Sequence, residues 1–204
     1  MNEPKIGFGR SSYRIVYCGP SESGKTTNIE SLNWLLPDRA VGRLVQLATE
    51  TSRTLYFDLL TINLEAISRT AGHATLEIFT VPGQSFYYAA RRRVLREADG
   101  IVFVADSRRH RLAANVDALN DIITAIHDAG RGVDDIPAVL QLNKCDDPTA
   151  IARDELLAAL GCENEPCVEA VAHEGRGVIE TLRLIARHAI AQSRNAQPIA
   201  QPVA

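Results

Sequence analysis

The sequence predicts an α/β fold, in which a mostly parallel six-stranded sheet carries helices on both faces. Three observations lead to this prediction. Apolar runs with the length and composition of strands alternate with segments whose apolar residues recur at helical spacing. A short connection around Ala71-Gly72 joins two neighbouring strand-like runs and makes that pair antiparallel. A glycine-rich phosphate-binding pattern follows the first strand and opens the first helix.

The amino-terminal half of the chain is expected to contain the antiparallel pair. A strand over Tyr13–Cys18 leads into a helix over Lys25–Leu36. Residues 40–53 are polar and weakly patterned, and we interpret them as a loop or short helix. The β-rich run Thr54–Ala66 predicts a strand at the sheet edge, and Thr75–Val81 predicts the strand antiparallel to it.

The carboxyl-terminal half alternates buried strands with helices. Gly100–Ala105 and Pro137–Leu142 are continuous apolar runs, typical of central strands that are covered on both faces. The segment between them places apolar residues on one helical face, namely Leu112, Val116, Leu119, Ile122, Ile123 and Ile126. Further helices are predicted over Tyr87–Ala98, Thr149–Leu160 and Val178–Ser193, and a short strand over Cys167–Ala172. The stripe of the last helix is Val178, Leu182, Ile185 and Ala189.

Composition limits the class of protein. The 204 residues suffice for one α/β domain, and the net charge of −3 argues against a nucleic-acid partner. The four cysteines form no C-x-x-C pair, so we expect reduced thiols in a cytoplasmic protein. No segment has the length and apolarity of a membrane span. Recruitment to a membrane or a cell pole is therefore expected to depend on partners.

The stretch GPSESGKT, residues 19–26, matches the phosphate-binding loop G-x-x-x-x-G-K-[ST]. Its glycines let successive backbone N–H groups turn onto phosphate oxygens, and the following helix directs its positive end at the anion. Lys25 is expected to reach the β- and γ-phosphates, and the Thr26 hydroxyl to bind Mg²⁺. The predicted phosphate-binding residues are Gly19, Ser21, Glu22, Ser23, Gly24, Lys25, Thr26 and Thr27.

The stretch NKCD, residues 143–146, follows a buried strand and selects the base. The Asp146 carboxylate is suited to accept hydrogen bonds from the N1–H and the exocyclic amino group of guanine, a donor pair that adenine lacks. Leaving a buried carboxylate unpaired costs several kcal/mol, which makes it a strong discriminator. Asn143 is expected to tie the base to the phosphate loop, and the Lys144 stem to cover the ring.

The order of these motifs resembles that of Ras-like small GTPases. The matching residues are GPSESGKT, Thr54, VPGQ, NKCD and Glu169–Ala172. More narrowly, RTLYFDLL (53–60), FTVPGQSFYYAARR (79–92) and VFVADS (102–107) resemble the bacterial gliding-motility GTPases, the MglA group. The resemblance implies a GTPase domain over residues 12–194, after an arm at 1–11 and before a disordered tail at 195–204. It also implies that the Ala172 N–H meets guanine O6.

The same resemblance implies roles for the switch residues. Thr54 would join Thr26 as a Mg²⁺ ligand when the γ-phosphate is present, with Gly83 near that phosphate. Gln84 would position the attacking water, and Arg53 would act as an arginine supplied in cis. In this group the partner is a roadblock-fold (roadblock/LC7-type) protein, MglB, which switches the GTPase off.

Two departures from the Ras-like pattern bear on catalysis. Thr80 stands where an aspartate usually holds Mg²⁺ through water, and Asp58 on the neighbouring strand is a candidate substitute. Ser21 replaces a usual glycine close to the space of the catalytic side chains, and Glu22 beside it must point outward. We therefore expect slow GTP hydrolysis.

Three functions stay open at this point. The first is a regulated switch that binds GTP or GDP with Mg²⁺, hydrolyses GTP slowly, and changes partners through its switch loops. It would regulate cell polarity or motility through a roadblock-type partner that activates hydrolysis. The second is a scaffold that binds GTP without hydrolysing it, which Ser21, Glu22 and Thr80 favour. The third is a small-molecule kinase, which the NKCD motif disfavours.

Overall fold

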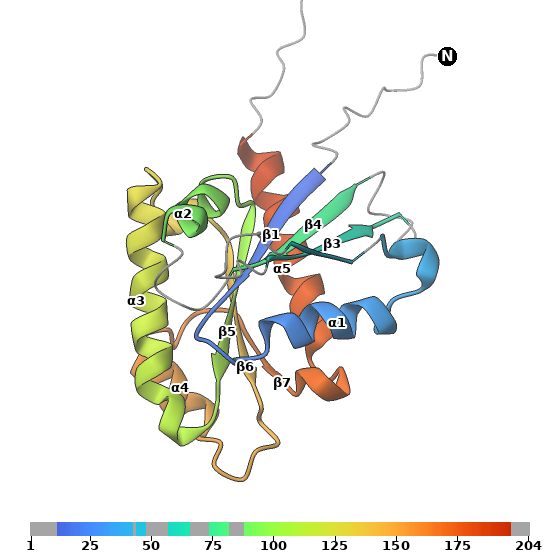
Figure 1. Ribbon diagram of the computed structural model, residues 1–204. Helices are drawn as coiled ribbons and strands as arrows, with labels where there is room; N and C mark the ends of the chain where they lie inside the picture. Colours follow the sequence, from blue (N-terminus) through green and yellow to red (C-terminus); the bar gives the residue numbers. More distant parts are fainter. Residues whose placement is uncertain (1–11, 43, 48–56, 66–73, 82–87, 197–204) are drawn as a thin grey trace, which may run out of the picture.

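A seven-stranded sheet forms the centre of the molecule (Figure 1). The computed structural model describes residues 12–42, 44–47, 57–65, 74–81 and 88–196. The strand order is β2-β3-β4-β1-β5-β6-β7, in which β2 and β3 run antiparallel to their neighbours and the other pairs are parallel. The strands are β1 (Ser12–Cys18), β2 (Val45–Leu47), β3 (Phe57–Asn63), β4 (Thr75–Thr80), β5 (Gly100–Asp106), β6 (Ala138–Asn143) and β7 (Cys167–Ala170). The predicted α/β fold class is confirmed.

Helices cover both faces of this sheet, as Figure 1 shows. The α-helices are α1 (Lys25–Leu35), α2 (Tyr88–Arg96), α3 (Leu112–Asp128), α4 (Arg153–Leu160) and α5 (Val178–Ala196). Single 3-10 turns are η1 (Asp38–Ala40), η3 (Arg109–Arg111), η4 (Val133–Asp135) and η5 (Ala172–Glu174). No helix in the described part of the chain is long and apolar enough to cross a membrane.

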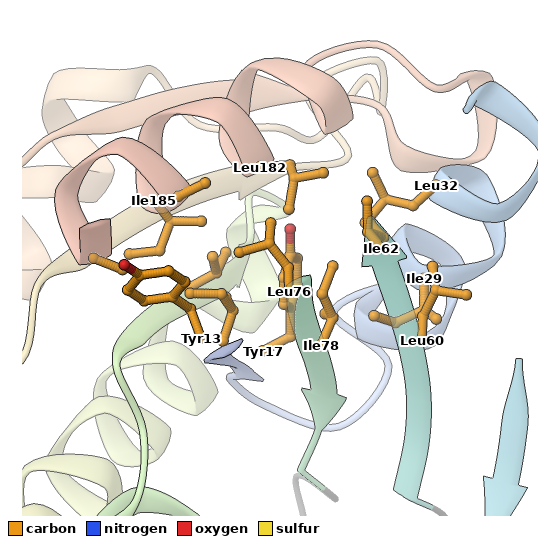
Figure 2. Packing of buried hydrophobic residues seen from close by; sticks show 14 of the residues in the cluster. Tyr13, Tyr17, Ile29, Leu32, Leu60, Ile62, Leu76, Ile78, Leu182 and Ile185 are labelled. Carbon is orange, nitrogen blue, oxygen red and sulfur yellow. The ribbon is translucent and has the colours of Figure 1, made fainter. Parts of the chain in front are cut away.

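Two hydrophobic clusters lie on opposite faces of the sheet because strand residues alternate in direction. Helices α1 and α5 pack on one face, where Tyr13 and Tyr17 of β1 share one cluster with Ile29 of α1 and Leu182 of α5 (Figure 2). Helices α2, α3 and α4 cover the other face. The four predicted stripe residues of α5 are all buried.

Two predicted elements differ from the observed ones, and an additional strand, β2, gives the sheet seven strands in place of the predicted six. Strand β2 lies within the weakly patterned region 40–53, so β3 is flanked on both sides and is not the edge strand that we expected. A three-residue strand is too short to show a period, which is why the sequence does not reveal it. Helix α4 begins at Arg153 and not at Thr149, because the Asp147 carboxylate accepts hydrogen bonds from the Thr149 N–H (2.8 Å) and hydroxyl (2.6 Å).

The ends of the chain bear on the predicted domain bounds. Helix α5 extends to Ala196, past the predicted end at Ser193, and so includes two residues that we assigned to the tail. The arm at 1–11 and the rest of the tail lie outside the described residues.

The four cysteines are free thiols; Cys18 is buried and the other three are half-buried.

Candidate nucleotide-binding site

The predicted binding motifs come together at the carboxyl ends of β1, β5, β6 and β7, which is where ligands bind in open α/β sheets. A cavity of about 250 Å³ opens there between the phosphate loop, the NKCD segment and η5. Its lining residues are Glu22, Gly24, Thr27, Asn143, Lys144, Asp146, Asp147, Ala172 and His173. Seven of the predicted binding residues therefore share one cavity.

The phosphate loop needs glycine at two places for different steric reasons. Gly19 has φ +133°, and a Cβ there would lie 2.3 Å from the Val104 carbonyl oxygen of β5. Gly24 has φ +100°, and its Cβ would lie 2.2 Å from Asn143 Nδ2. No other residue type fits either position. The spacing in the motif is thus a packing requirement as well as a phosphate-binding one.

Lys25 is buried, and its ammonium group lies against the start of the loop. Lys25 Nζ donates to the carbonyl oxygens of Gly19 (3.1 Å) and Pro20 (2.6 Å). Glu22 is exposed, as expected from its charge beside a phosphate site, while Ser21 is half-buried.

Asn143 joins the phosphate loop to the loop after β7. Its Nδ2 donates to the Ser23 carbonyl (2.7 Å), and its Oδ1 accepts from the Ala172 N–H (2.9 Å). The Asn143 side chain is buried, so both hydrogen bonds are protected from water. The contact between Ala172 and guanine O6 stays a prediction, and it requires the Ala172 N–H to be shared with Asn143.

Asp58 of β3 lies beside the predicted Mg²⁺ position. Its Oδ2 accepts from the hydroxyl groups of Thr26 (2.7 Å) and Thr80 (3.0 Å), and its side chain is almost fully buried. Thr80 also accepts the Asp58 N–H at 2.9 Å. Within the described residues these hydroxyls are the donors to the carboxylate, which leaves a buried negative charge next to Thr26. Hydroxyl and carboxylate oxygens are the ligands that Mg²⁺ prefers, so the residues fit this cation.

Four predicted site residues lie outside the described residues. They are Arg53, Thr54, Gly83 and Gln84. Their assigned roles in Mg²⁺ binding and in hydrolysis therefore remain predictions.

Two buried polar groups support the site and were not predicted. Asp106, at the end of β5, is fully buried and pairs with Arg108 (2.7 Å) and Lys144 (2.9 Å). Burial acts to raise the pKa of the Asp106 carboxyl. Hydrogen bonds from Arg108 and Lys144 nevertheless hold this pKa below its usual value. Gln141 of β6 exchanges hydrogen bonds with Asn28 of α1 (2.7 and 2.9 Å). The sequence signal for Asp106 and Gln141 is a polar residue within or at the end of an otherwise apolar strand.

Comparisons with known proteins agree with this arrangement. The profile of the ADP-ribosylation factor family matches residues 5–189. The mutual gliding-motility protein MglA of Myxococcus xanthus (strain DK1622) is 41% identical over 176 residues, covering 85% of this chain and 88% of MglA. ADP-ribosylation factor-like protein 6 of Caenorhabditis briggsae is 28% identical over 157 residues, covering 76% of this chain and 73% of that protein.

A solved structure shares the fold. The Arl6 BBS3 small GTPase from Trypanosoma brucei, with the bound nucleotide analogue GppNp, aligns with a TM-score of 0.63 at 22% identity. The alignment covers 89% of this chain and 99% of that one. On the family match and the identity to MglA, the chain belongs to the ADP-ribosylation factor family of Ras-like small GTPases, a family of GTP hydrolases, and to its MglA-like group.

Proposed function

We propose that this GTPase is a guanine-nucleotide-dependent switch that binds GTP or GDP with Mg²⁺, hydrolyses GTP slowly, and regulates cell polarity or motility. The observation that carries the proposal is the hydroxyl–carboxylate group of Thr26, Asp58 and Thr80 beside the phosphate loop. A switch needs a cation site that reports the γ-phosphate, and this group offers oxygen ligands next to Thr26, where we propose that the cation binds.

In the proposed cation site, the negative charge comes from a different strand than in the usual Ras-like site. Thr26 would bind Mg²⁺ directly, with Thr54 joining it, and Asp58 would supply the carboxylate that Thr80 lacks. Bound Mg²⁺ supplies neutralisation of the charge that develops on the phosphate oxygens. The chain's own residues hold the nucleotide: Lys25 and the loop N–H groups at the phosphates, and Asp146 at guanine.

Slow hydrolysis is supported by the side chain at Ser21. This residue stands at a loop position next to the space proposed for Gln84, which positions water, and for Arg53, which neutralises charge. We propose that a roadblock-fold partner aligns these two residues and thereby raises the rate. The proposal of a motility or polarity role draws on the 41% identity to MglA. Recruitment of this cytoplasmic switch to a pole or membrane would follow from such a partner.

The experiment that tests this function compares GTP turnover by the wild-type chain, alone and with an MglB-like roadblock protein, with that of Gln84→Ala. Slow turnover that rises with the partner and is lost in Gln84→Ala supports the switch. Turnover within seconds by the chain alone contradicts the expected slow rate.

A non-hydrolysing scaffold is the second candidate, favoured by Ser21 at its loop position. Absence of turnover under every condition, with GTP still bound, would support it over the switch. The nucleotide that co-purifies gives an independent check, because ATP in place of GTP or GDP would support the hypothesis of a small-molecule kinase.

A further inference from the structure

Side chains hold every carbonyl of the phosphate loop between Gly19 and Ser23. Lys25 binds the first two carbonyls, and Asn143 binds that of Ser23. The two in the middle are held from outside the loop: Arg111 Nη2 donates to the Ser21 carbonyl at 2.6 Å, and Lys144 Nζ donates to the Glu22 carbonyl. The loop conformation is therefore imposed by surrounding cations and an amide.

Holding these carbonyls also aims the N–H groups that bind phosphate. In a planar trans peptide the C=O and the following N–H point in opposite directions. Fixing the Ser21 carbonyl toward Arg111 thus directs the Glu22 N–H to the other side of the loop. Fixing the Glu22 carbonyl toward Lys144 does the same for the Ser23 N–H, which here makes a long hydrogen bond of 3.3 Å to the Pro20 carbonyl on the inner side of the loop.

The residue between these two peptides has an unfavourable backbone conformation. Glu22 has φ +64°, in the left-handed region that non-glycine residues rarely adopt. Such a conformation persists only where its surroundings hold it. The hydrogen bonds from Arg111 and Lys144 flank Glu22 on both sides and provide that restraint.

Asp106 organises the two cations. Its carboxylate is fully buried and lies 2.9 Å from Lys144 Nζ and 3.8 Å from Arg111 Nε, with Arg108 Nη2 also beside it at 2.7 Å. Asn115 fixes the Asp106 backbone through hydrogen bonds of 2.9 and 2.8 Å. A buried carboxylate at this point draws both side chains to one place at the outer side of the loop.

We propose that Asp106 and Arg111 are positioning residues for nucleotide binding, which hold the Ser21–Ser23 backbone with its N–H groups aimed at the β-phosphate. The inference rests on the proposed nucleotide site and deepens it. Arg111 acts through the loop backbone, and Asp106 acts through Arg111 and Lys144. Their effect should depend on the β-phosphate, since the loop N–H groups cradle that group and not the base.

The test measures affinity for GDP and for GMP, which lacks the β-phosphate, in the wild-type chain, Arg111→Met and Arg109→Met. Arg109 is the matched control, because it lies in the same 3-10 turn but pairs with Glu155 on the surface. We expect Arg111→Met to weaken GDP binding and speed its release about tenfold, as loss of a hydrogen bond from a charged donor does, with GMP affinity unchanged. Arg109→Met should match the wild type for both ligands.

Further variants keep the inference falsifiable if one variant folds poorly. Arg111→Lys retains a donor and should restore part of the GDP affinity. Asp106→Asn also releases Lys144 and should weaken GDP binding more than GMP binding. An equal loss for GDP and GMP, or no loss for GDP, overturns the inference alone. A wild-type chain that binds no guanine nucleotide overturns the proposed function itself.

Discussion

The substitution Asp58→Asn tests whether the charge at the end of the cation site comes from β3. Both threonine hydroxyls donate to the same oxygen, Asp58 Oδ2, at 2.7 and 3.0 Å. An asparagine that places its amide oxygen there keeps both hydrogen bonds and the side-chain volume. The substitution therefore removes the negative charge and little else.

The expected effect is a loss of Mg²⁺ affinity of about 10- to 100-fold, the range found when residues that support a metal site are replaced. Without Mg²⁺, the free energy of unfolding should stay the same or rise slightly, because a buried charge without a cation is removed. The assay measures release of a fluorescent GDP as the free Mg²⁺ concentration is varied, with urea unfolding in parallel. Asp128→Asn, an exposed change on α3, is the control.

A charge relocation sharpens this test. Because Thr80 Oγ1 lies 3.0 Å from Asp58 Oδ2, the double variant Asp58→Asn with Thr80→Asp moves the carboxylate from β3 to β4 within the same site. We expect it to recover most of the Mg²⁺ affinity. The reasoning is refuted if Asp58→Asn leaves the Mg²⁺ dependence of GDP release unchanged within twofold.

Three further predictions concern the framework of the site. Gly24→Ala should abolish GDP binding, because its Cβ would lie 2.2 Å from Asn143 Nδ2; Gly161→Ala, also at positive φ but with open space around it, should bind GDP normally. Arg131→Met should lower the urea-unfolding free energy by about 2 kcal/mol, since Arg131 donates to three carbonyls at the end of α2, and a loss below about 0.5 kcal/mol would contradict this. The lowered pKa of Asp106 means that its ionised form stabilises the folded state above the unfolded pKa of about 3.9, and that this stability is lost as pH falls through the folded pKa. Unfolding at stepped pH should show a smaller loss below about pH 4 in Asp106→Asn than in the wild type.

Much of the fold follows from local patterns. The apolar runs of β5 and β6 are continuous, the stripe of α5 is long enough to show its period, and each lies where it was predicted. The patterns fail where a side chain or a distant strand decides the local structure. The hydroxyl and N–H of Thr149 bind Asp147 and form a turn in place of a first helical turn, and β2 exists only because β3 is available to pair with it.

The candidate site likewise has parts that local sequence patterns predict and parts that they do not. The sequence by itself predicted the phosphate loop, Asp146 as the residue that selects guanine, and their place at the ends of strands, because each motif is local and its residue types are chemically distinctive. Only the tertiary structure decided that Asp58 reaches Thr26 and that Arg111 reaches the loop, pairs separated by 32 and 90 positions. The physical reason is that a charged side chain acts on the atoms next to it. The order of strands in the sheet decides which distant residues lie next to it, and local patterns do not encode that order.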